Sequence, residues 1–250
     1  MKKIVKLLVF ILVASLLFST PAVAKNGNAK ESLVSLGDSI PYGYNLNQHN
    51  KTTSKDAFPY LMGDYGDLQV RNLGIPGWTT PELLTSLKTD QKYRQAVRHA
   101  DYVTLTIGNN DLLQALQAAQ RESGGDQGSF MAILQQKVEE SNVFANIGAI
   151  IEEARSLTDA PIVIYNVYNP FQLDNPLHAI SSQILPSINK NFTDLASLYN
   201  VMYGNILLAD SYAAFGQNQD TYVIPDDIHP TIEGQIKLAE IGLDVLGLNE

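Results

Sequence analysis

Two short motifs, far apart in the chain, contain the side chains that a nucleophilic hydrolase uses. Gly37-Asp38-Ser39-Ile40 supplies a serine, and Asp226-Asp227-Ile228-His229-Pro230 supplies a histidine and carboxylates. A serine hydroxyl attacks an acyl group only when a base takes its proton, and a histidine held by a carboxylate is a common base. Either motif alone is a weak signal, but the two together indicate hydrolysis through a serine nucleophile.

Five short apolar runs are expected to form the strands that position these motifs. Several of them are continuous rather than alternating, which is typical of strands buried on both faces of a parallel sheet. Turn residues and a helical pattern follow each run, so the sequence predicts an α/β domain in three layers with right-handed crossovers. The runs are Ser32–Leu36, Leu68–Leu73, Tyr102–Ile107, Ile162–Val167 and Ile206–Ala209.

The helical patterns between the runs differ in length. Phe130–Leu157 is the longest and has apolar residues at a spacing near 3.6, which predicts one amphipathic helix. The last helix is expected from Pro230 onward, with the proline in its first turn. Residues 123–129 are rich in glycine but lie between two helical stretches. We interpret them as a connecting loop, because a phosphate-binding loop would join a strand to a helix.

The polar candidates all follow the carboxyl end of a predicted strand. Ser39 comes after the first run, Gly77 after the second and Asn110 after the third, while Asp226 and His229 precede the last helix. The carboxyl ends of parallel strands share one edge of an open sheet, where ligands bind at the change in strand order. Segments distant in sequence are therefore expected to meet at one point.

Four motifs in this order carry a family resemblance. Between the two opening motifs lie Asn72 to Gly77 and Gly108-Asn109-Asn110-Asp111. With these, residues 32–245 resemble the SGNH, or GDSL-type, esterase and lipase family. The family pattern places the active asparagine directly before an aspartate, which selects Asn110. The resemblance implies the SGNH hydrolase fold: a flavodoxin-like parallel sheet of about five strands with helices on both faces.

The resemblance also implies a role for each residue of the site. Ser39 is expected to attack an ester carbonyl and form an acyl-enzyme, with His229 as base and then acid, and with Asp226 holding the imidazole. The backbone N–H groups of Ser39 and Gly77 and the side-chain amide of Asn110 are expected to stabilise the oxyanion. No metal or cofactor is expected.

Each of these residues also has a purely structural interpretation. Ser39 and Asn110 are suitable helix caps, and Gly77 is suited to a turn after a proline. Asp226 and Asp227 could both form turns, and we expect Asp227 to do so. Capping and turn formation are compatible with the roles assigned to Gly77 and Asn110.

The first 24 residues have the layout of a secretory signal peptide. A basic start is followed by the apolar run 7–18 and by the small-residue site Ala22-Val23-Ala24. Cleavage near Ala24 would leave a flexible tail over residues 25–31 and a hydrolase domain over 32–250. An uncleaved anchor is the alternative, but the apolar run is shorter than the roughly 20 residues that span a bilayer. The protein is therefore expected outside the cell or in its envelope.

Composition limits the partners. The chain carries 17 Lys and Arg against 26 Asp and Glu, a formal net charge of −9, which disfavours binding to nucleic acid or to anionic lipid surfaces. It has no cysteine, which excludes disulfides, thiolate metal sites and cysteine nucleophiles. The family resemblance implies a small-molecule ester or lipid as the partner.

The substrate is the least determined part of the prediction. Aromatic residues near the strand ends, Tyr42, Trp78 and Tyr168 among them, are candidates for an acyl pocket. They favour a lipid-type, lysophospholipase-like ester. Removal of O-acetyl groups from cell-wall or plant polysaccharide is the alternative, and it predicts an open groove with exposed rings. A catalytically silent binding protein on the same fold is a third hypothesis.

Overall fold

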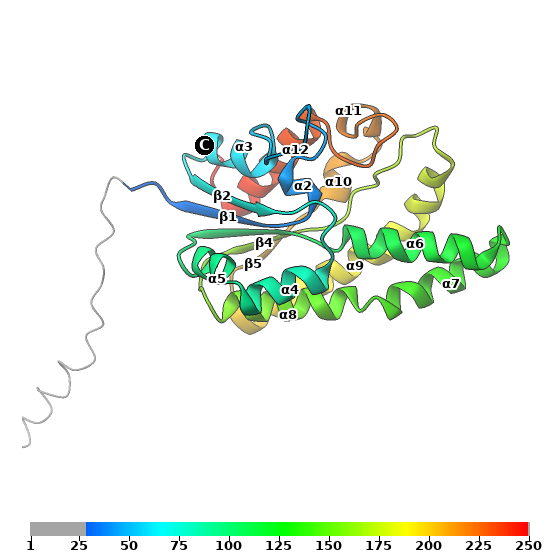
Figure 1. Ribbon diagram of the computed structural model, residues 1–250, viewed down its shortest axis with the longest axis horizontal. Coiled ribbons are helices and arrows are strands. Elements are labelled where there is room, and N and C mark those ends of the chain that lie inside the picture. Colours follow the sequence, from blue (N-terminus) through cyan, green and yellow to red (C-terminus); the bar gives the residue numbers. More distant parts are fainter. Residues whose placement is uncertain (1–28, 250) are drawn as a thin grey trace, which may run out of the picture.

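A computed structural model describes residues 29–249, which form a parallel sheet covered by helices on both faces (Figure 1). The expected signal peptide, its cleavage site and residues 25–28 of the expected tail lie outside the described residues. The sheet has the order β2-β1-β3-β4-β5, and every neighbouring pair is parallel. Its strands are β1 (Ser32–Gly37), β2 (Gln69–Gly74), β3 (Tyr102–Thr106), β4 (Ile162–Tyr165) and β5 (Ile206–Ala209).

This strand order confirms the expected flavodoxin-like α/β fold. Each predicted run lies within two residues of an observed strand. For β1, β3 and β4 the reason is their nearly continuous burial, which leaves a clear apolar signal. The chain leaves β1 toward β2 on one side and then returns to add β3 on the other. The carboxyl ends of β1 and β3 therefore flank the switch point at which ligands bind in open α/β sheets.

The two faces of the sheet have separate apolar cores. Along β4, Ile162 and Ile164 pack into one core while Val163 and Tyr165 pack into the other, as the alternation of side chains along a strand requires. The helices of the first core are α4 (Thr80–Thr89), α5 (Gln91–Arg98), α8 (Val143–Arg155) and α9 (Pro176–Tyr203). Those of the second are α3 (Phe58–Tyr65), α10 (Ser211–Phe215) and α12 (Ile232–Leu246), with the short α11 (Gln219–Tyr222) beside them.

Two helices extend beyond the sheet as a hairpin. They are α6 (Asn109–Ser123) and α7 (Gln127–Glu140), and they lie side by side at the end of the molecule where α9 begins (Figure 1). The connection expected over residues 123–129 is shorter than predicted. Asp126 accepts hydrogen bonds from the backbone N–H groups of Gly128 and Ser129, and so starts α7 inside that segment.

The single long helix predicted over Phe130–Leu157 is wrong. The chain forms α7 and α8 instead, and it breaks at Asn142, whose φ of 53° is left-handed. Asparagine is one of the few residues that adopt this conformation at low cost, but the apolar spacing runs through the break almost unchanged. Periodicity alone could not reveal the break.

The start of the last helix also differs from the prediction. Pro230 does not lie in the first turn, since it forms an isolated bridge with Val223. Thr231 is the N-cap, its side chain accepts from Gly234 N–H, and α12 begins at Ile232. The motif containing His229 is therefore held at its end by a pairing between loop residues.

Candidate active site

Ser39 lies directly beyond the carboxyl end of β1. Gly37 ends the strand, and there is no room for a side chain at this position because a Cβ would lie 2.2 Å from the carbonyl oxygen of Thr106. Asp38 then caps the four-residue helix α2 (Ser39–Tyr42) by accepting a hydrogen bond of 2.9 Å from Ile40 N–H. Ser39 is the first residue of that helix and is nearly buried.

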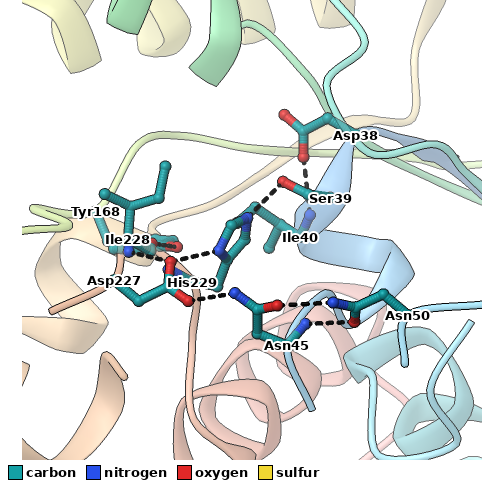
Figure 2. A network of polar contacts seen from close by, with 9 residues as sticks. All are labelled: Asp38, Ser39, Ile40, Asn45, Asn50, Tyr168, Asp227, Ile228 and His229. Atoms are coloured by element: carbon teal, nitrogen blue, oxygen red, sulfur yellow. Dashed lines mark hydrogen bonds and ion pairs between the residues drawn. The ribbon is translucent and has the colours of Figure 1, made fainter. Parts of the chain in front are cut away.

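The hydroxyl of Ser39 contacts His229, as the two motifs predicted. Nε2 of His229 lies 3.0 Å from Oγ of Ser39, and Nδ1 lies 2.6 Å from Oδ1 of Asp227 (Figure 2). With the proton on Nδ1, the imidazole donates to the carboxylate and its Nε2 is free to accept the serine proton. The three side chains thus form a continuous line of contacts from a hydroxyl through an imidazole to a carboxylate, an arrangement through which a histidine can activate a serine.

The carboxylate against His229 is that of Asp227, and the prediction of Asp226 as its partner requires correction. Pro225 and Asp226 are the central residues of a turn in which Asp227 N–H donates to Ile224 carbonyl. Asp226 has a φ of 58° there and is exposed, as expected for the second central residue of such a turn. The structure thus exchanges the expected roles: Asp226 forms the turn and Asp227 faces the histidine.

The carboxylate of Asp227 is held from several directions. Burial acts to raise its pKa, but hydrogen bonds from Asn45, from Ile228 N–H and from His229 outweigh this and hold the pKa below its usual value. The group is therefore ionised at neutral pH. The side chains of His229 and Asp227 are 11% and 18% exposed, so the pair is largely shielded from water.

Gly77 and Asn110, the expected oxyanion donors, belong to adjoining segments. Asn110 donates from Nδ2 to the carbonyl oxygen of Trp78 at 2.8 Å, which ties the start of α6 to the loop after β2. Gly77 lies in that loop with a φ of 82°, and the space where a Cβ would lie is open. Among residues 29–249, the backbone N–H groups of Ser39 and Gly77 donate to no other residue.

The two asparagines of the third motif have different contacts. Asn109 donates from Nδ2 to Oδ2 of Asp38 at 3.0 Å, whereas Asn110 faces the Gly77 loop. The selection of Asn110 as the oxyanion candidate is consistent with this arrangement. Asn109 instead supports the turn that carries Ser39.

Gln235 fixes the distance between the two halves of the site. This fully buried residue of α12 accepts from Phe58 N–H at 2.8 Å and donates from Nε2 to the carbonyl oxygen of Ile40 at 3.0 Å. It joins the helix that follows His229 to the helix that begins at Ser39. Both of its polar ends are satisfied, so burying the amide is not costly.

Of the aromatic residues predicted to line a pocket, Tyr168 does so. Its ring is buried against Phe215, and its hydroxyl donates to the carbonyl oxygen of Ile228 at 2.8 Å. Tyr42 instead donates to the carbonyl oxygen of Asn50. Trp78 stacks on Tyr93, with 5.6 Å between ring centroids, and packs against the core.

An apolar pocket adjoins the site, and of its lining the sequence analysis had named Tyr168. At one end it is lined by Asn109, Tyr168 and Ile228, all of which neighbour the Ser39 and His229 contact. Further along, its walls are leucine, isoleucine and valine side chains of α6, α7 and α9, such as Leu113 and Leu185. In the sequence, these aliphatic residues have the spacing of a helix face that packs against a core. That spacing does not distinguish a helix face that lines a pocket from one that is packed.

Within the described part of the chain, none of the helices is long and apolar enough to cross a membrane.

The fold and the position of the site define an SGNH-type hydrolase. A family model described as GDSL-like Lipase/Acylhydrolase matches residues 35–236. The chain belongs to this family of esterases and lipases, as the four motifs predicted.

Two bacterial relatives are similar in sequence. The protein YpmR of Bacillus subtilis (strain 168) is 29% identical over 185 residues, which cover 69% of this chain and 64% of YpmR. The chain thus spans less than two thirds of the length of that relative. The spore germination lipase LipC of Bacillus licheniformis is 26% identical over 169 residues, which cover 66% of this chain and 71% of LipC.

Solved structures share the fold at low sequence identity. The lipase Lip_vut3 from a goat rumen metagenome aligns with a TM-score of 0.67 and 22% identity over 86% of this chain and 97% of its own. An acetylxylan esterase from Geobacillus stearothermophilus aligns with a TM-score of 0.58 and 20% identity over 87% of this chain and 94% of its own. At these identities the likeness concerns the fold alone.

Proposed function

We propose that this protein hydrolyses carboxylic esters through an acyl-enzyme formed on Ser39. The observation that carries the proposal is the continuous contact from Ser39 Oγ to His229 Nε2 and from His229 Nδ1 to Asp227. Membership of a lipase and acylhydrolase family supports the same reaction class.

In the first half of the proposed reaction, His229 takes the hydroxyl proton as Ser39 Oγ bonds to the ester carbonyl carbon. The imidazolium then gives that proton to the leaving alcohol as the carbon–oxygen bond breaks. In the second half, His229 takes a proton from a water molecule as the water oxygen bonds to the acyl carbon. The imidazolium then returns a proton to Ser39 Oγ as the acyl–serine bond breaks, which releases the acid and the free serine. Asp227 is ionised throughout, and it fixes the tautomer and stabilises the imidazolium.

The oxyanion of each tetrahedral intermediate requires hydrogen-bond donors. We assign this role to the backbone N–H groups of Ser39 and Gly77 and to the Nδ2 group of Asn110. Two features support the assignment: neither backbone N–H donates to another described residue, and the amide of Asn110 has a second N–H beyond the one that binds Trp78. Loss of one such donor typically costs about 3 kcal/mol of transition-state stabilisation.

The apolar pocket favours an ester with a long acyl chain, such as a lipid or lysophospholipid. A chain attached at the Ser39 end would pass Tyr168 and Ile228 and continue between the side chains of α6, α7 and α9. Burial of each methylene contributes about 0.8 kcal/mol. An acetyl group would leave most of this pocket unused.

Deacetylation of a polysaccharide is the second candidate, and one observation favours it. The solved structures that share this fold include an acetylxylan esterase. The aromatic rings that the carbohydrate hypothesis requires at an open groove are engaged elsewhere, however, since Trp78 stacks on Tyr93 and Tyr168 is buried.

The test is a rate series on p-nitrophenyl esters from acetate to palmitate, with the Ser39→Ala variant measured alongside. Turnover by the natural chain and background rates for the variant support the serine mechanism. An optimum at medium or long chains supports the lipid-type substrate, and an optimum at acetate supports the deacetylase. Inactivity toward every ester, together with no labelling of Ser39 by a phosphonate ester, would favour the silent binding protein.

We propose secretion on the basis of the leader over residues 1–24, with the hydrolase domain over 32–250. A solved structure with the same fold, that of an extracellular lipase from Streptomyces rimosus, fits this location. Amino-terminal sequencing of the protein recovered from culture medium tests it. A mature chain that begins at Lys25 supports cleavage after Ala24, and an intact amino terminus in the cell pellet contradicts it.

A further inference from the structure

The second carboxylate oxygen of Asp227 is bound by a residue from a distant loop. Nδ2 of Asn45 donates to Oδ2 of Asp227 at 2.5 Å, while Oδ1 accepts from His229 Nδ1 and from Ile228 N–H (Figure 2). Asn45 lies in the loop between α2 and α3, 182 positions before Asp227. The two oxygens are thus held by different parts of the chain.

We propose that Asn45 is a positioning residue for the reaction, an inference that rests on the proposed function. Its amide sets the orientation of the Asp227 carboxylate, and through the carboxylate it sets the direction in which the His229 ring points toward Ser39. Asn45 does not line the apolar pocket, so its effect is confined to the chemical step.

The neighbouring Asn50 determines which end of the Asn45 amide faces Asp227. Asn50 Nδ2 donates to Asn45 Oδ1 at 2.7 Å, and Asn50 Oδ1 accepts from Asn45 N–H at 2.8 Å. Because the oxygen of Asn45 is occupied by a donor, its nitrogen must face the carboxylate. Tyr42 holds the pair in turn, since its hydroxyl donates to the carbonyl oxygen of Asn50 at 2.8 Å.

The backbone of the same loop is adapted to this arrangement. Asn45 and Asn50 have φ values of 65° and 45°, in the left-handed region that asparagine tolerates and most residues avoid. Between α2 and Asn45, the ring of Tyr44 packs on the imidazole of His229, with 5.0 Å between centroids. One loop therefore contacts both the histidine and its carboxylate, which accounts for a conformation that an ordinary connection would not need.

The test compares Asn45→Gly and Asn45→Asp with the matched variants Asn47→Gly and Asn47→Asp. Glycine and aspartate both accept the left-handed backbone, so neither change strains the loop. Aspartate has nearly the same shape as asparagine and retains the oxygen that accepts from Asn50, but it replaces the donor with a carboxylate facing Asp227. Asn47 lies in the same loop and donates only weakly, to the carbonyl oxygen of Thr52 at 3.3 Å.

Three quantities are measured for each variant: kcat and KM on the preferred p-nitrophenyl ester, the rate of Ser39 labelling by a phosphonate ester, and the midpoint of thermal unfolding. We expect Asn45→Gly to lower kcat and the labelling rate by about tenfold or more, with KM within about twofold. We expect Asn45→Asp to lower both rates further, although it is the closer mimic. The Asn47 variants should stay within about twofold of the natural chain.

Several results would overturn the proposal. Wild-type kcat in Asn45→Asp would mean that the donor is not needed. A rise in KM at constant kcat would place Asn45 in substrate binding, and equal losses in the Asn47 variants or a collapse of the unfolding midpoint would assign it a structural role. If the natural chain is labelled and active while the Asn45 variants match it, only this inference fails. If the natural chain neither reacts with esters nor is labelled, the proposed function fails with it.

Discussion

The carboxylate of Asp38 accepts a hydrogen bond of 3.0 Å from the amide of Asn109, although 71 positions separate the two residues. The contact joins the turn that carries Ser39 to the first turn of α6, across the ends of β1 and β3. Asp38 is fully buried, and this burial raises its pKa to about 6, against the opposing effect of the hydrogen bonds from Ile40 and Asn109. A carboxylate next to the proposed nucleophile therefore takes up a proton in mild acid.

This raised pKa predicts a specific dependence of stability on pH. The folded chain holds the proton of Asp38 more tightly than the unfolded chain, whose carboxyl has the ordinary value of 3.8. The stabilisation of the folded chain by this bound proton is therefore fully present below pH 3.8 and is lost as the pH rises through about 6. Asp38→Asn should remove this slope, because an amide does not titrate; it keeps only one of the two oxygens that accept from Ile40 and Asn109, so the slope and not the absolute stability is compared. Urea unfolding across this pH range, with the exposed Asp64→Asn as control, tests it. The same slope in natural chain and variant would contradict the assignment.

Substituting Asp226 and Asp227 one at a time tests which of the two carboxylates supports His229 in the reaction. Asp227→Asn should lower kcat by about a thousandfold or more, because the imidazole loses its anionic partner and its preferred tautomer. Asp226→Asn, at an exposed turn position that also accepts asparagine, should leave kcat within about threefold of the natural value. Steady-state kinetics on one p-nitrophenyl ester decide between them. A larger loss for Asp226→Asn would restore the original assignment.

Narrowing the apolar pocket should shorten the preferred acyl chain. Leu113 lines the pocket on α6 and is only half-buried, so Leu113→Trp fills the space with little disturbance of the core. We expect kcat/KM for long-chain esters to fall by about tenfold or more while that for acetate stays within about twofold, since the lost methylene contacts belong to the distal chain. Leu198→Trp, at an exposed position of α9, is the control. An unchanged chain-length profile would place the acyl chain elsewhere.

The break between α7 and α8 predicts opposite effects of two substitutions at one position. Asn142→Ala should lower the free energy of unfolding by about 1 kcal/mol, because alanine is strained at a φ of 53°. Asn142→Gly should be close to neutral, since glycine adopts this conformation freely. Thermal unfolding of both variants measures the difference. Equal stability of the two would show that the backbone at this position relaxes.

Much of the fold could be predicted from the sequence because its signals are local. The strands β1, β3 and β4 are buried along almost their whole length, so each of them appears as a short apolar run such as Ile162–Tyr165. The helix break at Asn142 and the start of α12 depend instead on single backbone angles and on a bridge between Val223 and Pro230. The spacing of apolar residues along the sequence does not indicate such single-residue features.

The same distinction applies to the site. The contact between Ser39 and His229 could be predicted because their motifs are distinctive, whereas the oxyanion role of Asn110 stays a prediction. Asp226 and Asp227 are adjacent and chemically identical, so only the turn at Pro225 determines which of them faces the imidazole. Asn45 was missed because its importance arises from a contact with Asp227, 182 positions away. The aliphatic walls of the pocket were missed because the same side chains would equally suit an ordinary helix core.

The two hydrogen bonds of the Gln235 side chain, to Phe58 and to Ile40, have a consequence for the synthesis of the chain. Ser39 is made early and His229 is made 190 residues later. The amide of Gln235 binds Ile40 and Phe58 only when α12 packs against α2 and α3. A nascent chain emerging from its amino terminus therefore exposes its proposed nucleophile long before the base arrives. If the proposed function holds, the emerging chain is inert toward esters until α12 packs against α2 and α3.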